Sequence, residues 1–174
     1  MNTSPAAKAP KYKSRDRVPA WRVFTDPYCF LGFGFGTGLA PMAPGTFGTL
    51  AAIPLYIALS GLSVPIYSAI VAGLFLIGIL ICQRCEDRLD VSDHPGIVWD
   101  EIVGYLITLT AIPFSWQAAG LGFVLFRIFD ILKPWPIKRL DRTIPGGFGI
   151  MLDDAVAGLF AAVGLHLLRP FIGV

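Results

Sequence analysis

Two pairs of adjacent carboxylates stand out in a chain of 174 residues that is otherwise poor in charge. Asp100 is followed by Glu101, and Asp153 is followed by Asp154. Two adjacent charges repel by roughly 4 kcal/mol at 4 Å when the effective dielectric constant is near 20, so each pair calls for a compensating positive charge. Magnesium takes carboxylates, waters and phosphate oxygens as ligands. The four acids therefore predict a Mg²⁺ site. The alternative is that they cap helices and pair with nearby basic residues.

A second charged group lies between the two acidic pairs. Arg127, Asp130 and Lys133 are spaced three residues apart, so on one helix they share a broad face. Basic side chains hold phosphate oxygens through charge-assisted hydrogen bonds, and Asp130 is placed to orient a water molecule or Arg127. The basic residues available to a phosphate in this part of the chain are Arg127, Lys133, Lys138, Arg139 and Arg142.

This set of residues indicates phosphate hydrolysis by direct attack of water rather than through a covalent intermediate. The sequence contains no Cys-x5-Arg loop, no Asp-x-Asp pair and no Gly-x-Ser-x-Gly elbow. Cys82 and Cys85 form a C-x-x-C without a partner pair, so we interpret them as incidental thiols rather than a zinc or redox site. His94 and His166 lack the surroundings of a histidine-dependent lipid phosphatase.

The elements that position these residues are expected to be membrane helices. Apolar residues make up 55% of the chain and charged residues 15%, against about 25% charged in an ordinary soluble domain. No charged residue occurs from Tyr28 to Gln83 or from Ile102 to Phe126. A helix of about 20 apolar residues crosses a bilayer core. We expect an all-α polytopic membrane protein with four to five membrane-embedded helices, including spans over 64–82 and from about 155 to 168.

Residues 98–133 can be read as one straight helix, or as a hairpin that turns near Pro113 and Ser115. A hairpin keeps the basic residues on both sides of this stretch on the same side of the membrane as the basic N-terminal tail. Since positive charge gathers on the cytoplasmic side, the hairpin is favoured. It also brings the two acidic pairs to one membrane face, with 84–101 as a polar loop on that face. We therefore expect the active site to face the cytoplasm.

The Gly- and Pro-rich segment over 31–49 cannot be a regular spanning helix, because Pro41 and Pro44 interrupt it. Helix is expected to resume near Thr46 as its N-cap and to run to about Leu59. Backbone N–H groups around Thr37 and Thr46 are candidate phosphate binders. Close packing of small residues is an equally good interpretation of this segment.

The first 22 residues are rich in Lys, Arg, Ala and Pro and are expected to form a disordered basic cytoplasmic tail. Residues 23–174 then form a single helical membrane domain. The basic residues of the tail adjoin the membrane domain and carry no motif for reading nucleic acid, so nucleic acid is not an expected partner.

Four ordered segments give the chain a family resemblance: GFGTGLAPMAPGTFGTLAAIP at 34–54, IVWDEIVGYLITL at 97–109, FRIFDILKPWPIKRLDR at 126–142 and GGFGIMLDDAVAG at 146–158. With the spacing between them, they cover most of residues 30–160. The chain resembles phosphatidylglycerophosphatase A, a bacterial membrane family that removes the terminal phosphate of phosphatidylglycerophosphate. The resemblance implies magnesium dependence, a phospholipid substrate, the product phosphatidylglycerol, and a place in the bacterial cytoplasmic (inner) membrane.

The site residues lie in these segments, and their individual roles are inferred from charge and spacing. The expected metal ligands are Asp100, Glu101, Asp153 and Asp154. The expected phosphate-binding residues are Arg127, Lys133, Arg142, Thr46 and Thr37. The expected catalytic residues are Asp100, Arg127, Asp130 and Asp154.

Two other functions use related residues. A phosphatidyltransferase acting on a CDP-linked lipid also uses Mg²⁺ and clustered aspartates, but it needs a third acid along the same helix as Asp153 and Asp154, which is missing. A small ion-coupled transporter would carry its acids near the middle of a span.

Overall fold

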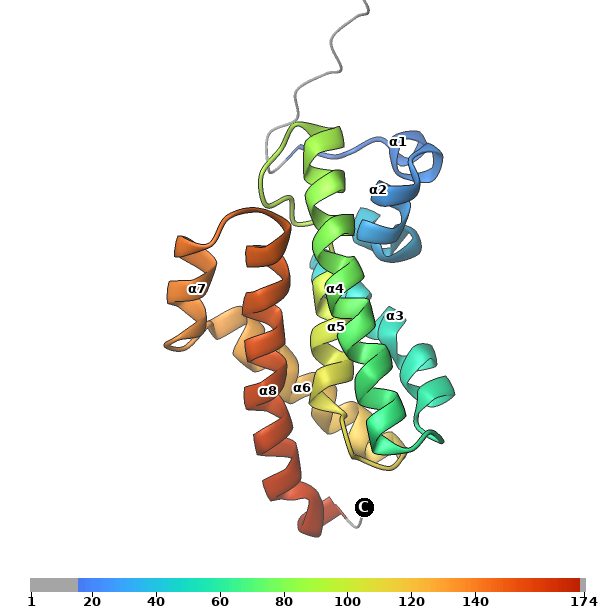
Figure 1. Ribbon diagram of the computed structural model, residues 1–174, viewed down its shortest axis with the longest axis vertical. Helices are drawn as coiled ribbons and strands as arrows, with labels where there is room; N and C mark the ends of the chain where they lie inside the picture. The colour runs from blue at the N-terminus through green and yellow to red at the C-terminus, as the bar shows by residue number, and fades with distance from the viewer. Residues whose placement is uncertain (1–15, 173–174) are drawn as a thin grey trace, which may run out of the picture.

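The computed structural model describes residues 16–172, and every regular element in this part of the chain is a helix (Figure 1). In chain order the elements are α1 (Ala20–Thr25), α2 (Pro27–Gly32), the 3-10 helix η1 (Gly34–Leu39), α3 (Pro44–Leu59), α4 (Val64–Leu89), α5 (Trp99–Thr108), α6 (Trp116–Leu132), α7 (Ile137–Thr143) and α8 (Gly146–Ile172). The predicted all-helical fold is confirmed.

Among the described residues, α4 and α8 are the two helices long and apolar enough to cross a membrane, and α3 is a shorter apolar helix. Both long helices leave large apolar side chains exposed. On α4 these include Leu76 and Ile77, and on α8 Val163 and Leu167 are more than 60% exposed. Exposed apolar surface of this kind is typical of contact with lipid or a partner. The number of membrane-embedded helices stays a prediction.

The hairpin predicted near Pro113 is confirmed, because α5 and α6 are separate helices joined by a turn after Thr108. Ser115 begins α6 as its N-cap, and its hydroxyl oxygen accepts a hydrogen bond from Ala118 N–H at 3.0 Å. Figure 1 shows this turn at the same end of the molecule as the connection between α3 and α4. One straight helix across this stretch is excluded.

The span predicted over 64–82 is longer than expected. The sequence placed its end at Cys82 because charged residues follow, but α4 continues to Leu89, so residues 84–89 are helical and not loop. Cys85, Glu86 and Leu89 are buried, at helical spacing from the buried Cys82. Packing of this face against α2 and α8 keeps the last two turns helical despite the charges on the other side.

The last helix begins nine residues earlier than expected. Asp153 and Asp154 were expected at its start, but α8 starts at Gly146, so both acids lie two turns inside it. A Cβ at Gly147 would overlap the Ile79 carbonyl of α4, and Gln83 Oε1 accepts the Gly147 N–H at 2.9 Å. The glycines therefore let the first turn of α8 approach α4 closely.

The Gly- and Pro-rich segment is irregular, as predicted. Within η1, Phe35 and Gly36 have φ values of 60° and 97°, so no regular helix passes through. Helix α3 begins at Pro44 after Ala43 rather than with Thr46 as N-cap. At the N-terminal end, α1 begins at Ala20, inside the stretch expected to be a disordered tail, and residues 1–15 lie outside the described residues.

Candidate active site

Two glycines set the distance between the helices that carry the acids. Gly104 lies one turn after Asp100 on α5, and Gly158 lies one turn after Asp154 on α8. A Cβ at Gly104 would lie 2.9 Å from the Asp154 carbonyl oxygen, and a Cβ at Gly158 would overlap the Gly104 carbonyl. Thr108 Oγ1 donates to the Gly104 carbonyl at 3.0 Å and approaches that of Gly158 at 3.4 Å. The close approach brings Asp100 and Asp154 opposite each other.

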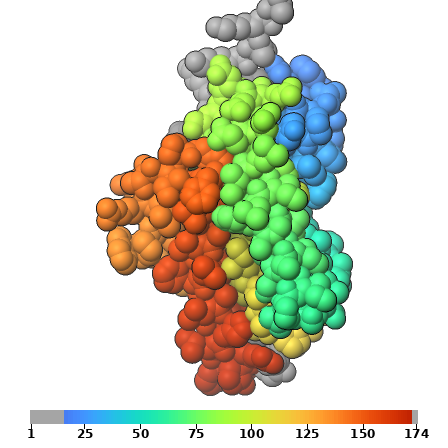
Figure 2. Space-filling model, in the orientation of Figure 1, coloured from blue at the N-terminus to red at the C-terminus, as the bar shows by residue number. Residues whose placement is uncertain are grey.

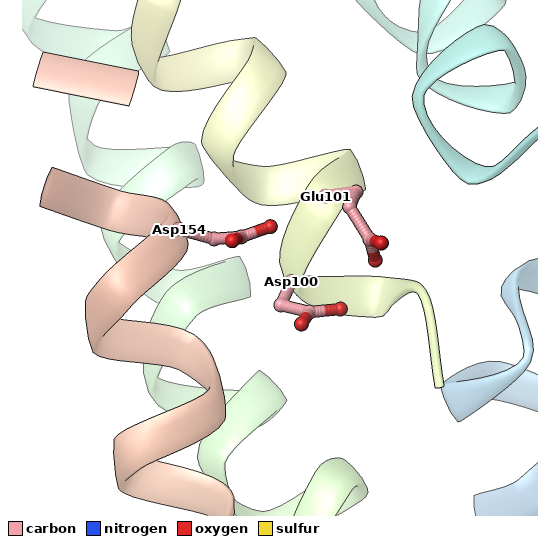
Figure 3. A group of neighbouring side chains, drawn as sticks. All are labelled: Asp100, Glu101 and Asp154. Carbon is pink, nitrogen blue, oxygen red and sulfur yellow. The ribbon is translucent and has the colours of Figure 1, made fainter. Parts of the chain in front are cut away.

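Asp100, Glu101 and Asp154 form a carboxylate cluster. One oxygen from each lies within 4.8 Å of the others, and Figure 3 shows Asp154 reaching from α8 toward the two acids of α5. Asp154 is 3% exposed, and the other two are largely enclosed. Asp100 Oδ1, Glu101 Oε2 and Asp154 Oδ2 are buried without a hydrogen-bond partner. Buried oxygens of this kind are unfavourable unless something satisfies them.

These observations fit a small hard cation. Oxygen ligands from one or two carboxylates, completed by water and phosphate, are the set that Mg²⁺ takes in phosphate-handling proteins. A divalent ion would satisfy the three buried oxygens and offset the repulsion among three acids. The cluster therefore contains three of the four expected ligands, and the fourth, Asp153, points elsewhere.

Asp153 pairs with a cation from another helix end. The Lys133 ammonium donates hydrogen bonds to Asp153 Oδ2 and, at 2.7 Å, to Asp141 Oδ1. Lys133 follows α6 with φ 41°, and this left-handed turn ends the helix. Burial lowers the pKa of Lys133, but the hydrogen bonds to the two carboxylates outweigh it, so the pKa lies well above its ordinary value. Lys133 is thus a fixed positive charge beside the cluster.

Arg127 is held between two acids. Its Nη1 donates to Asp130 Oδ2, as the spacing of three residues on α6 predicts, and lies 3.7 Å from Glu101 Oε1. Gly45, in the first turn of α3, lies against this pair, since a Cβ there would overlap Glu101 and lie 2.9 Å from Arg127 Nη1. Asp130 therefore orients Arg127, which was one of the two roles expected for it.

The acids and basic residues line one cavity of about 770 Å³. Every expected site residue except the two threonines borders it. Arg142 borders it without any ion pair or side-chain hydrogen bond to the described residues, so its charge is free for a ligand. Thr37 and Thr46 do not border the cavity, and the Thr37 hydroxyl donates to the Gly34 carbonyl at 2.9 Å. From the Gly-rich segment, the cavity instead receives Ala43, Pro44 and Gly45.

Among the residues that border the cavity and that sequence reasoning missed are Asp141, Glu86 and His94. Asp141 shares Lys133 with Asp153, and its only signal in the sequence is its place next to Arg142 in a basic segment. Glu86 is buried at the end of α4 and accepts the Asp93 N–H, and His94 is buried in the loop that follows. Both fell in a stretch interpreted as polar loop, where a buried side chain leaves no pattern.

The fold and the site define the class of protein. The described part of the chain is helical, with two membrane-length helices, and its buried carboxylates and basic side chains face a common cavity. This arrangement is suited to an enzyme that acts on a phosphorylated lipid headgroup.

The chain belongs to the phosphatidylglycerophosphatase A family, whose model matches residues 30–169. It is 46% identical over 145 residues to phosphatidylglycerophosphatase A of Escherichia coli, and the matched residues cover 83% of this chain and 84% of that protein. It is 48% identical over 140 residues to the protein of the same name from Haemophilus influenzae, at 79% and 86% coverage. A Bacteroides thetaiotaomicron protein provisionally named a phosphatidylinositol-3-phosphatase is 36% identical over 153 residues, at 82% and 94%. No solved structure matches. The family resemblance of the four segments is confirmed, and with it the expectation of a phosphatase.

Proposed function

We propose that this chain is a magnesium-dependent phosphatidylglycerophosphatase, which hydrolyses phosphatidylglycerophosphate to phosphatidylglycerol and phosphate. The observation that carries the proposal is the carboxylate cluster. Asp100, Glu101 and Asp154 present three unpartnered buried oxygens to the same cavity as Arg127, Lys133 and Arg142. Carboxylates alone would repel a phosphate, whereas carboxylates that hold a cation attract it.

Asp100, Glu101 and Asp154 would hold the ion. At that position the ion would supply Lewis acidity for the phosphoryl group and for the attacking water, and would offset the charge that develops in the reaction. The chain's own residues supply the rest of the site. Arg142 forms no ion pair with the described residues and is available to phosphate oxygens, while Asp130 fixes the direction of the Arg127 guanidinium. Asp153 and Asp141 fix the Lys133 ammonium. Because these charges are set before the substrate arrives, little reorganisation is needed during the reaction.

A membrane position follows from the same arrangement. The lipid tails of the substrate would stay beside the exposed apolar faces of α4 and α8, while the headgroup enters the cavity. Trp116 and Trp135 are exposed at the beginning of α6 and just before α7, as residues of a membrane interface commonly are. The cytoplasm would then lie on the side of the cavity, because Arg84, Arg88, Lys138 and Arg139 lie there and the α5–α6 turn lies at the opposite end (Figure 1).

The experiment is phosphate release from phosphatidylglycerophosphate by the purified protein in detergent micelles, with Mg²⁺ or with EDTA. We expect turnover with Mg²⁺, its loss in EDTA and its return when excess Mg²⁺ is added. No turnover by a well-folded, monodisperse sample in any of these conditions would contradict the proposal and favour an ion-coupled transporter. Full turnover in EDTA would contradict the role of the metal alone.

A further inference from the structure

We propose that a basic shelf on α7, formed by Trp135, Lys138, Arg139 and Arg142, binds the phosphodiester of the lipid headgroup. The proposal rests on the proposed function and deepens it. A phosphatidylglycerophosphate headgroup carries two phosphates separated by a glycerol, one a monoester to be cleaved and one a diester joined to the lipid. The carboxylate cluster and its basic neighbours account for the first phosphate only.

The shelf has its own hollow next to the main cavity. Together with Thr143, its four residues line a second cavity of about 350 Å³. Arg142 and Thr143 border both cavities, so the two spaces meet at the end of α7. Figure 2 shows α7 projecting at the side of the molecule next to α8. A headgroup can therefore lie across Arg142 with one phosphate in each space.

The basic side chains of the shelf are not paired with acids in the part of the chain that the structure describes. Lys138, Arg139 and Arg142 are exposed and form no ion pair or side-chain hydrogen bond with any described residue. The neighbouring Lys133, by contrast, is neutralised by two carboxylates. The same helix also carries Asp141, but that carboxylate pairs with Lys133. The three basic side chains therefore leave an excess of positive charge on α7, which favours an anionic ligand.

The apolar surroundings indicate that this ligand is part of a lipid. Trp135 is 78% exposed, and Ile131 and Leu132 just before it are 66% and 71% exposed. Only Ile137 anchors this helix in the core, where it is fully buried. A diester phosphate lies at the boundary between acyl chains and water, where an aromatic ring beside basic residues is favourable. The shelf thus matches the diester and its lipid better than a free phosphate in solution.

The test is product inhibition with two soluble probes during hydrolysis of phosphatidylglycerophosphate in neutral detergent micelles. Dihexanoyl phosphatidylglycerol, below its micelle concentration, carries the diester and lacks the monoester; inorganic phosphate resembles the monoester alone. In Lys138→Gln and Arg139→Gln we expect the inhibition constant of the lipid to rise about tenfold, because one charge-assisted contact is lost. The inhibition constant of phosphate should change less than twofold. Arg84→Gln removes an equal charge from exposed α4 surface outside both cavities and should move neither constant.

Three results would overturn the proposal. These are no effect of the lipid probe on wild-type activity, an inhibition constant for this probe that is the same in the shelf variants as in the wild type, and equal weakening of both probes, which would indicate a general effect of charge. All three require an active wild-type protein. They are therefore distinct from failure of the proposed function, in which wild-type protein releases no phosphate.

Discussion

The substitution Gly104→Ala tests whether close packing of α5 on α8 builds the carboxylate cluster. The added Cβ would lie 2.9 Å from the Asp154 carbonyl oxygen and 2.5 Å from Phe126 Cε2, whereas ordinary contact begins at 3.4 Å. The Phe126 ring can turn aside, but the carbonyl belongs to a helix backbone. The two helices must therefore separate by about half an ångström at this level, which is one turn from Asp100 on α5 and at the backbone of Asp154 on α8.

A shift of this size matters because Mg²⁺ demands ligands at about 2.0–2.1 Å in near-octahedral geometry. We expect the Mg²⁺ concentration for half-maximal activity to rise about tenfold and kcat/KM at low Mg²⁺ to fall by about 10- to 100-fold, as for an ångström-scale misplacement. Overpacking should also lower the free energy of unfolding by about 1–3 kcal/mol. The assays are phosphate release across a Mg²⁺ titration and thermal unfolding in detergent.

The matched control is Gly73→Ala on α4, where a Cβ meets no atom within 4 Å. This change should leave the Mg²⁺ dependence at its wild-type value and stabilise the helix by up to about 1 kcal/mol. A Gly104→Ala protein with wild-type Mg²⁺ dependence and wild-type turnover would refute the packing account of the site.

Four further predictions follow from the charges around the cavity. Asp154→Asn should lower kcat/KM by more than about 100-fold, since even the loss of an outer-shell partner of a metal can cost that much. Its elution in size-exclusion chromatography should be unchanged, and a near-normal kcat/KM would remove Asp154 from the site. Arg127→Lys should lower kcat/KM about tenfold or more, since one ammonium cannot reproduce a guanidinium that contacts two acids. Full activity in this variant would show that the reaction does not depend on the guanidinium geometry. Asp141→Asn should lower the pKa of Lys133, because it removes one of the two carboxylates that raise it, so activity at alkaline pH should be lost at a lower pH than in the wild type; identical pH–rate profiles would show that Asp141 does not control the charge of Lys133. A cysteine at Ser115 should react with an impermeant thiol reagent from outside the cell and one at Arg139 only after permeabilisation; the opposite pattern would invert the proposed topology.

The sequence predicted the parts of the site that depend on local spacing and on charge. The Arg127–Asp130 pair follows from a separation of three residues on one helix. The hairpin between α5 and α6 follows from the bias of positive charge toward one side of a membrane. Both are properties of a short stretch of chain or of its composition, so no knowledge of distant contacts is needed.

The doublet Asp153–Asp154 could not be resolved in the same way. Adjacent residues on a helix point about 100° apart, so only one of the two can face α5, and the other must find a partner on a different side. The partner of Asp153 is Lys133, which also contacts Asp141. Nothing local in the sequence marks either of these contacts. Asp100 and its neighbour Glu101 both reach the cluster, the latter through a side chain one methylene longer.

Helix ends were predicted least well, because tertiary packing fixed them. The glycines at the start of α8 look like breakers until α4 is placed against them, and the charged end of α4 looks like loop until its buried face is seen. In both places, contacts between segments far apart in the chain overrode local propensity.

The most direct test of the central idea is metal binding itself, measured by titrating purified protein with Mn²⁺, a paramagnetic replacement for Mg²⁺ at oxygen sites. Free Mn²⁺ would be followed by electron paramagnetic resonance. Wild-type protein should bind Mn²⁺ saturably and release it to excess Mg²⁺. Asp100→Asn and Asp154→Asn should each weaken binding by about 100-fold, whereas Arg84→Gln should not. Equal Mn²⁺ affinity in the wild type and in both aspartate variants would contradict the account.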